Sequence, residues 1–327
     1  MSSAHPSRAV PAHSRALPLR VGTRGSPLAL WQTRYFLARL TTFCPVLRSM
    51  DVFEEHAIRT TGDVVQDRRL TDIGGKGLFA KEIHEALADG RIDFAVHSLK
   101  DLETELPAGI VLAGTMTRED ARDALILAPH LADAEDPIAA LPQGAAIGTS
   151  SVRRQAQLLH SRPDLRITAM RGNVQTRLDK LRAGDCDATL LAIAGMNRLG
   201  LGHEATAILS PAIMVPAACQ GIVGITVRED DTALREMLTG IEDPDANSVS
   251  TAERALLAEL DGSCRTPIGG HAELDGQGGL TLTGLVARAD GSFLLRRTLA
   301  GARADAARIG RELGASLRAD CPRDVFA

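Results

Sequence analysis

A lysine and an aspartate follow a short apolar segment, and this pair is the clearest sign of chemistry in the chain. Residues 92–96 form the segment, and Lys100 and Asp101 stand just beyond it. The run has the length and texture of a buried parallel strand. Ligands of open α/β sheets bind beyond the carboxyl ends of the strands, so this ammonium and carboxylate are placed for charge chemistry. The alternative is a strand that runs into an ordinary solvated loop.

Arginines recur at comparable positions elsewhere. Those just past a predicted strand, at or near a helix start, are Arg24, Arg153, Arg154, Arg171 and Arg198. Arg177 lies one to two turns into its helix. Such positions converge on one face of the fold, so we expect a cleft lined with guanidinium groups and a ligand that carries several carboxylates or phosphates. A single arginine usually belongs to a solvated helix surface, but six at corresponding positions favour the cleft.

Two similar stretches position these side chains. A strand at 17–21 leads into Gly22-Thr-Arg-Gly-Ser26, where Ser26 is a good helix N-cap. A strand at 145–148 leads into Thr149-Ser-Ser151, which caps the next helix in the same way. Strands and helices continue to alternate through residue 193, a pattern typical of a parallel sheet with right-handed crossovers. We therefore predict two similar α/β lobes that face each other across a central cleft.

The pattern of predicted helices and strands changes after residue 240. An amphipathic helix is predicted at 249–260, and hairpin turn signals occur at Asp275-Gly276 and Asp290-Gly291, before a last helix at 304–317. These features indicate a small α+β C-terminal domain. The predicted division is a disordered tail at 1–18, a first lobe at 19–117 plus about 221–240, a second lobe at 118–220, and the α+β domain at 241–327.

Composition narrows the functional classes. The chain has 327 residues, enough for two or three domains, with 44% hydrophobic and 24% charged residues, as in a soluble globular α/β protein. No apolar run reaches the ~18 residues of a membrane span. Aromatic content of 3% and a net charge of −4 argue against nucleic acid as a partner. A small polycarboxylate or polyphosphate ligand fits better.

The cysteines and the N-terminus bear on location. There are five cysteines without a CxxC motif, which argues against a disulfide framework or a zinc site and fits a reducing cytoplasm. The first eighteen residues lack the apolar core of a secretory signal. Their acid-free, arginine-containing composition fits either a disordered tail, which we favour, or a transit peptide.

Two loops contain candidate functional residues. Gly74-Gly-Lys-Gly77 does not meet P-loop spacing, so Lys76 is better read as a basic residue on a mobile loop, 61–77, above the site. Flexibility without function is the alternative. Cys264 lies on a loop of small residues beside Arg265, where a thiol would be reachable and partly ionised. Taken alone, however, such a cysteine is more often inert than reactive.

Together these segments resemble the porphobilinogen deaminase family, the hydroxymethylbilane synthases of tetrapyrrole formation, from about residue 19 into the third domain. The motifs that carry the resemblance are Thr23–Gln32, Gly74–Phe79, Ala95–Asp101, Gly148–Arg154, Arg171–Val174 with Thr176-Arg177, Gln220-Gly221, Thr251–Arg254 and Gly262–Cys264. Their number and order make the resemblance specific. It implies two lobes akin to type II periplasmic binding proteins.

The resemblance also implies a mechanism. Cys264 would carry a covalent dipyrromethane cofactor through a thioether, and the enzyme would add porphobilinogen stepwise with loss of ammonia and release a linear tetrapyrrole by hydrolysis. Asp101 would be the catalytic carboxylate, stabilising an azafulvene-like cation, and Lys100 and Gln220 would support the cofactor. Carboxylates of cofactor or substrate would be bound by Arg24, Ser26, Arg153, Arg154, Arg171, Arg177 and Arg198, with Lys76 and Ser151 at the same site.

Departures from the family pattern occur at three places. Asp72 stands where a lysine is common, Leu102-Glu-Thr replaces the common Val-Pro, and Cys219 stands where glycine is frequent. A non-catalytic solute-binding or sensor protein of the same ancestry is the rival, and it would need neither Asp101 nor a reachable Cys264. We expect a cytoplasmic monomer whose partner is a small molecule, with no metal, membrane or nucleic acid.

Overall fold

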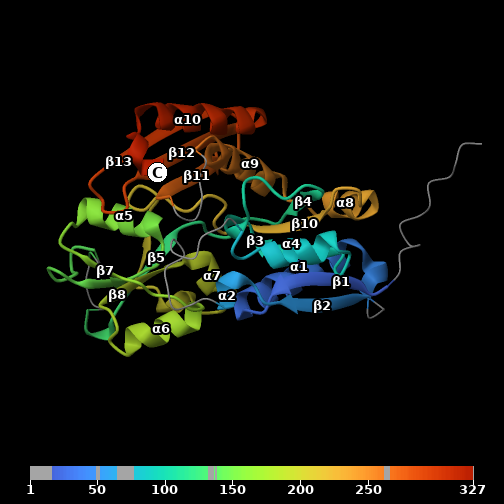
Figure 1. Cartoon of the computed structure of the whole chain (residues 1–327), viewed down its shortest axis with the longest axis horizontal. Helices are drawn as coiled ribbons and strands as arrows, with labels where there is room; N and C mark the ends of the chain where they lie inside the picture. Colours follow the sequence, from blue (N-terminus) through green and yellow to red (C-terminus); the bar gives the residue numbers. More distant parts are fainter. Residues whose placement is uncertain are drawn as a thin grey trace, which may run out of the picture.

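The computed structural model describes residues 17–48, 52–64, 77–131, 136, 138–260 and 266–326. Within these residues the chain forms two five-stranded sheets and one three-stranded sheet, each covered by helices (Figure 1). Two α/β lobes lie side by side, and the third unit packs above both of them in this view. This is the predicted fold class, two α/β lobes with a small α+β domain.

The first lobe has the strand order β2-β1-β3-β10-β4. Its strands are β1 Leu19–Arg24, β2 Phe53–Ile58, β3 Phe94–Ser98, β4 Ile110–Thr115 and β10 Val223–Arg228. Its helices are α1 Pro27–Phe43, α2 Thr61–Val64, α4 Lys81–Ala88 and α8 Thr232–Thr239. The Ser26 hydroxyl caps α1 by accepting the backbone N–H of Ala29 at 3.3 Å, as its position before Pro27 predicted.

The second lobe repeats this arrangement with the order β7-β6-β8-β5-β9. Its strands are β5 Asp123–Leu127, β6 Ala146–Gly148, β7 Arg166–Thr168, β8 Ala188–Ala192 and β9 Ala207–Leu209. Its helices are α5 Val152–Ser161, α6 Val174–Arg182 and α7 Ile193–Arg198. Ser151 caps α5 and Asn173 caps α6, each accepting the backbone N–H three residues on.

The sheets are mixed rather than purely parallel. In each lobe four strands run in one direction and one is reversed. The reversed strands are β10, which is antiparallel to β3 and β4, and β5, which is antiparallel to β8 and β9. Each of these two strands follows a segment that arrives from the other lobe. The alternating pattern therefore predicted the parallel strands correctly and missed the two that reverse direction.

The third unit is an antiparallel sheet under two helices. Its elements are α9 Pro244–Glu259, β11 Ile268–Leu274, β12 Gly279–Ala287, β13 Leu294–Ala302 and α10 Ala306–Asp320. Both predicted hairpin turns occur between these strands. Short 3-10 helices occur along the chain at η2 Pro45–Arg48, η3 Leu99–Asp101, η4 Pro129–Leu131, η5 Gly202–Glu204, η6 Arg303–Asp305 and η7 Arg323–Phe326.

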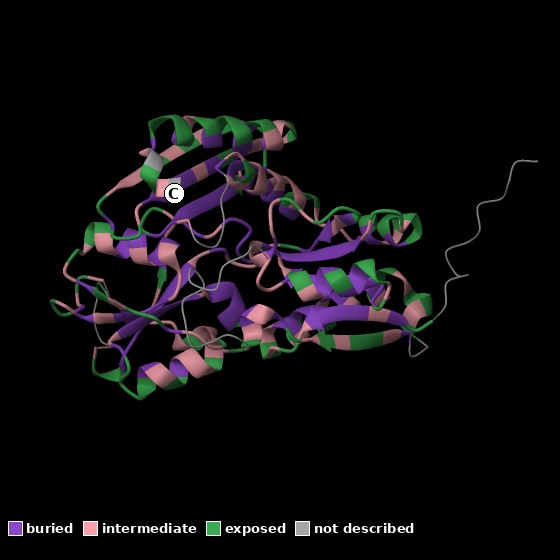
Figure 2. Cartoon of the chain, viewed as in Figure 1, coloured by how far each residue is buried: buried purple, intermediate pink, exposed green. Residues whose placement is uncertain are grey.

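Buried apolar side chains form a core around each sheet, and the core of the third unit extends to Leu99 and Leu102, which follow β3 of the first lobe. The sheets are purple, meaning buried, through their centres in Figure 2. Phe36 and Phe94 pack edge to face in the first lobe, while Leu190 and Leu256 are fully buried in the second and third units. Among the described residues, none of the helices is both long and apolar enough to span a bilayer.

Candidate active site

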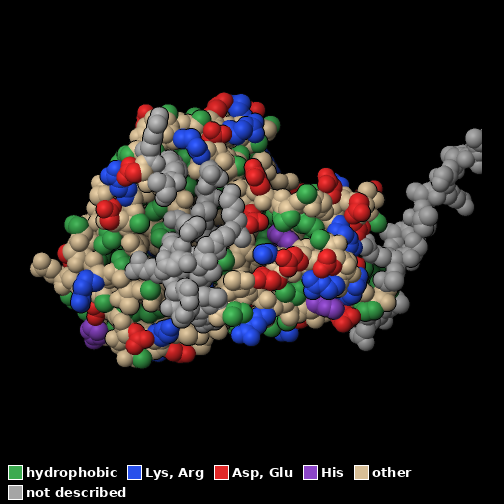
Figure 3. Space-filling view, in the orientation of Figure 1, with side chains coloured by type: hydrophobic (Ala, Val, Ile, Leu, Met, Phe, Trp, Pro, Cys, Tyr) green, Lys and Arg blue, Asp and Glu red, His purple; other side chains and the backbone are tan. Residues whose placement is uncertain are grey.

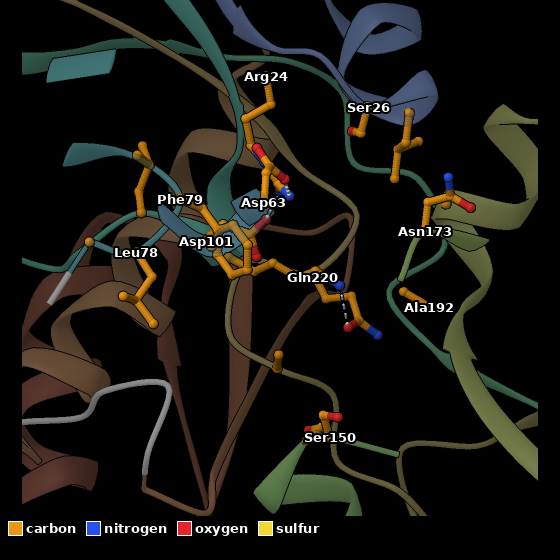
Figure 4. A pocket seen from close by; sticks show the side chains of 18 of the residues that line it. Arg24, Ser26, Asp63, Leu78, Phe79, Asp101, Ser150, Asn173, Ala192 and Gln220 are labelled. Atoms are coloured by element: carbon orange, nitrogen blue, oxygen red, sulfur yellow. Dashed lines mark hydrogen bonds and ion pairs between the residues drawn. The ribbon is translucent and has the colours of Figure 1, made fainter. Parts of the chain in front are cut away.

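A cavity of about 1090 Å³ lies between the lobes and is closed on one side by the third unit. It is lined by residues that follow β1, β3, β6, β7 and β8, as the strand-end rule predicted. The predicted site residues in its lining are Arg24, Ser26, Lys100, Asp101, Ser151, Arg153, Arg154, Arg171, Arg177 and Gln220. Cys264, Lys76 and Asp72 lie outside the described residues. Figure 4 shows the cavity from close by.

Asp101 contributes a carboxylate to the first-lobe wall. It ends the turn η3, and its side chain is 29% exposed. Arg24 Nη1 lies 3.5 Å from Asp101 Oδ2, and the Arg24 guanidinium stacks over the Phe79 ring at 4.2 Å. Asp63 of α2 holds the other edge of that guanidinium, as Figure 4 shows. The wall thus presents a carboxylate that is held in place and still open to the cavity.

Lys100 lies beside Asp101 and connects the lobes. Its Nζ donates to Gln220 Oε1 at 3.2 Å, and Gln220 Nε2 donates in turn to Asp123 Oδ1 at 2.8 Å. Burial lowers the pKa of Lys100 to about 8, although nearby Asp101 and Asp123 act to raise it. The ammonium is therefore a strong donor with little water around it.

Arg153 and Arg154 share one buried carboxylate. Arg153 Nη1 lies 2.8 Å from Asp123 Oδ2, and Arg154 Nη2 donates to Asp123 Oδ1 at 2.7 Å. The Asp123 side chain is fully buried, and the two guanidinium groups hold its pKa well below the usual range against the effect of burial. Arg154 Nε is buried without a hydrogen-bond partner among the described residues. Two cations on one anion leave this wall with a positive excess.

Arg171 and Arg177 supply further positive charge from the start of α6. Arg171 Nη2 donates to the Gly62 carbonyl at 3.0 Å, and Arg177 Nε donates to the Gly172 carbonyl at 3.0 Å. Burial, followed by the charges of Arg154 and Arg171, lowers the pKa of Arg177 to about 10. Repulsion of this kind favours an anionic ligand among the arginines.

Arg198 is not among the residues that line the cavity. It ends α7, and its Nη2 donates to the Gly221 carbonyl at 2.6 Å while its Cζ lies 5.9 Å from the Trp31 ring centroid. Gly221 has φ +89°, and a Cβ there would lie 2.3 Å from the Glu119 carbonyl oxygen. Arg198 therefore lies beside the two chain segments that cross between the lobes, near Glu119 and Gly221, and not beside the other arginines.

The third unit is fixed to the same crossings by a buried ion pair. Glu253 of α9 is fully buried, and its Oε1 accepts from Arg118 Nη1 at 2.7 Å. Its Oε2 accepts the backbone N–H of Cys219 at 2.5 Å. Cys219 has φ +63°, a left-handed conformation that glycine adopts more readily than a residue with a side chain.

Two aspartates at the site were not predicted from the sequence. Asp63 and Asp123 each neutralise predicted arginines, yet neither follows a strand end in the way that Asp101 does. Asp123 opens an otherwise apolar strand, which is the only local signal that it carries. An acidic residue at that point needs a partner, but the sequence does not say which one.

Comparison with known protein families shows the family to which the chain belongs. Residues 19–236 match "Porphobilinogen deaminase, dipyromethane cofactor binding domain", and residues 248–319 match "Porphobilinogen deaminase, C-terminal domain". This chain belongs to the porphobilinogen deaminase family. The match covers the two lobes and the third unit, and it does not favour a non-catalytic binding protein.

Curated relatives named porphobilinogen deaminase agree along most of the chain. The protein of Nitrobacter winogradskyi is 48% identical over 281 residues, covering 86% of both chains. That of Caulobacter vibrioides is 51% identical, covering 80% of this chain and 82% of its own. The chloroplastic protein of Oryza sativa is 44% identical, covering 89% of this chain and 80% of its own.

Among solved structures, likeness to binding proteins is weaker. An ancestral arginine-binding protein bound to arginine is 14% identical, with a TM-score of 0.39, covering 71% of this chain and 95% of its own. A score this low supports no conclusion about ligands.

The donor groups of the cavity fit the dipyrromethane cofactor of the porphobilinogen deaminases. The wall of the second lobe carries more guanidinium groups than carboxylates, and Arg154 Nε is a buried donor without a described partner. These groups suit the acetate and propionate side chains of pyrroles. Asp101 offers an acceptor for pyrrole N–H groups.

Proposed function

We propose that this protein is a hydroxymethylbilane synthase, a transferase that condenses porphobilinogen head to tail with loss of ammonia and releases a linear tetrapyrrole. The observation that carries the proposal is that an open carboxylate, Asp101, and a wall of arginines line the same cavity in a chain of this family. The bound dipyrromethane supplies the pyrrole carbon to which porphobilinogen is joined.

In this proposal Asp101 stabilises the positive charge that develops on the substrate pyrrole as ammonia leaves. A fixed carboxylate in a shielded cavity is most effective where charge develops. Arg24, which stacks on Phe79, holds Asp101 on its side of the cavity, so the carboxylate need not reorganise during the reaction. Its partial exposure leaves it accessible to a substrate N–H group.

In this proposal the second-lobe wall and the helix starts near it bind the carboxylates of the ligand. Arg171 and Arg177 line the cavity near the start of α6, and a guanidinium group can bind acetate or propionate with paired contacts. Ser26 and Ser151 cap the helices α1 and α5 at the cavity edge. Arg153 and Arg154 act with Asp123 between them, while Lys100 and Gln220 link this wall to the first lobe.

Cys264 is the proposed attachment point of the cofactor. Thr266 and Ile268, just beyond it in the chain, line the cavity, as does Leu257 of α9. A thioether can form only from a cysteine sulfur at this position. Lys76 is proposed as a further basic contact, and the domain division is proposed as predicted from the sequence.

Intact mass tests the assignment. The parent protein should be heavier than its polypeptide by one dipyrromethane unit, whereas Cys264→Ser should have the bare mass and no deaminase activity. Cys186→Ser, at a buried position beside β8, is the matched control and should remain loaded. Full loading of Cys264→Ser would refute the attachment site.

We further propose that the protein works as a monomer in the cytoplasm with porphobilinogen as its partner, without nucleic acid or membrane. The face in Figure 3 mixes acidic and basic side chains, with no extended patch of one sign such as a polyanion surface needs. Four described cysteines are free thiols, which fits a reducing compartment.

A further inference from the structure

Three charged groups stand in a row along the first-lobe wall. Asp63 comes from α2, Arg24 from the end of β1, and Asp101 from the turn after β3. Arg24 Nη2 donates to Asp63 Oδ1 at 2.5 Å, and Arg24 Nε lies 3.2 Å from both carboxylate oxygens of Asp63. Arg24 Nη1, on the opposite side, lies 3.5 Å from Asp101 Oδ2. One guanidinium therefore bridges two carboxylates.

Asp63 is held firmly in this position. Its Oδ2 accepts the hydroxyl of Thr60 at 2.7 Å, and Thr60 itself is fully buried. Burial acts to raise the pKa of Asp63, but hydrogen bonds from Arg24 and Thr60 outweigh it and lower the pKa. Phe79 covers the face of the Arg24 guanidinium at 4.2 Å. The edge of Arg24 toward Asp63 is thus fixed before any ligand contact.

The charges in the row decide what Asp101 can do. Asp63, Arg24 and Asp101 together carry a net charge of about −1 when all are ionised, since one cation offsets one of two anions. Without the Asp63 charge, Arg24 would neutralise Asp101 and pull it toward itself. A carboxylate neutralised in this way is a poorer partner for a cation that forms in the cavity.

We propose that Asp63 is a positioning residue for the deaminase reaction, acting through Arg24 to keep Asp101 in place and negatively charged. This inference rests on the proposed function, because it takes Asp101 as the group that faces the developing cation. It also assigns Arg24 a structural partner on its Asp63 edge, where a ligand carboxylate would otherwise bind. A contrary role for Asp63 would be to block Arg24 until a ligand carboxylate displaces it.

The two roles predict opposite kinetics for Asp63→Asn, which keeps the shape and removes the charge. If Asp63 positions Asp101, kcat per loaded enzyme falls by about 10- to 100-fold, while KM for porphobilinogen changes less than about threefold. If Asp63 blocks Arg24, KM falls and kcat is kept. Asp63→Glu, which restores the charge, should recover part of kcat under the proposal.

Asp164→Asn is the matched control. Asp164 binds Arg162 through the same two nitrogens, Nε and Nη2, each at 2.8 Å, and its side chain is 27% exposed against 24% for Asp63. It lies outside the cavity lining. Loss of an equivalent ion pair there should leave kcat and KM within about twofold of the parent, since this pair does not face the cavity.

A double variant separates positioning from general damage. If Asp63 acts through Arg24, then Asp63→Asn should lower kcat much less in an Arg24→Gln background than in the parent. Equal losses in both backgrounds would overturn the proposal, as would an unchanged kcat in Asp63→Asn. Intact mass of each variant reports cofactor loading independently, so absence of loading in the parent would refute the proposed function instead.

Discussion

The two lobes share one strand order but place their acidic residues at different positions. In the first lobe the reversed strand β10 begins at Val223, opposite Ser98 at the end of β3. In the second lobe the reversed strand β5 begins at Asp123, opposite Ala192 at the end of β8. The first lobe instead places its acid three residues beyond Ser98, at Asp101, on the cavity side.

The difference separates a carboxylate for chemistry from a carboxylate for architecture. Asp101 is 29% exposed and has one long ion pair, at 3.5 Å, so its charge remains directed at the cavity. Asp123 is fully buried between two arginines and organises the groups that bind the ligand. Equivalent scaffolds therefore yield different functions according to whether the acid lies within the strand or beyond its end.

Replacing the open carboxylate should give the largest effect. Asp101→Asn keeps the shape and an acceptor but removes the charge, so turnover should fall by about 10²- to 10⁴-fold. The measurement is steady-state ammonia release at saturating porphobilinogen, per loaded enzyme. Its free energy of unfolding should change by less than about 1 kcal/mol, because the ion pair is long and partly exposed.

Replacing the buried carboxylate should affect the fold first. Asp123→Asn leaves two buried guanidinium groups without their counter-ion, which should cost about 3–5 kcal/mol in the free energy of unfolding. Urea denaturation of both aspartate variants, with Asp185→Asn as an exposed control, measures this. Equal stability losses for Asp101→Asn and Asp123→Asn would break the distinction between them.

A substitution on the arginine wall should have an intermediate effect. Arg177→Lys keeps the charge but loses paired contacts to a carboxylate, so it should cost about 1.5–3 kcal/mol in stabilising ligand or intermediates. Kinetics and the distribution of covalent intermediates by mass report this loss. Arg166→Lys, at an exposed position on β7, is the control. Parent-like behaviour of Arg177→Lys would show that Arg177 makes no paired contact with a ligand carboxylate.

Acid should weaken the first lobe through two buried histidines. The rings of His84 and His97 lie 5.5 Å apart, and burial lowers their pKa values to about 4 and about 3. Unfolded histidine has a pKa near 6.5, so below that pH the unfolded state binds protons that the folded state does not. Stability is therefore full above pH ~6.5 and falls as the pH drops toward 4.

The expected loss between pH 7 and pH 6 is about 1 kcal/mol from this pair. Lobe two carries Leu191 where lobe one carries His97, as the strand registers show. The variant His97→Leu should accordingly lose about half of the pH dependence in urea denaturation. An identical dependence in parent and variant would assign it to other groups.

The sequence predicted the groups that stand at strand ends and missed the groups that neutralise them. Arg24, Ser26, Asp101 and Ser151 follow local strand-turn-helix patterns, and all four line the cavity. A strand-end position places a side chain at the cleft almost regardless of the rest of the fold. This is why the main outline of the site could be predicted without a structure.

The sequence did not predict the ion-pair partners of these groups, because long-range pairing brings them together. Asp123 meets Arg154 only because β5 reverses direction beside β8, and Asp63 meets Arg24 through α2. Arg198 follows a strand as the others do, but the short helix α7 carries it to the crossing at Gly221. Such contacts depend on how the two lobes are joined, which periodicity does not reveal.

The central claim is that Asp101 carries the chemistry of a cavity whose arginines are organised by Asp123. The most direct test is an intact-mass time course after mixing cofactor-loaded Asp101→Asn with porphobilinogen, beside the loaded parent. The parent should gain pyrrole units in successive steps, and the variant should remain at its starting mass for at least about 100 times longer. Pyrrole addition at the parent rate would contradict the account and leave Asp101 a structural residue.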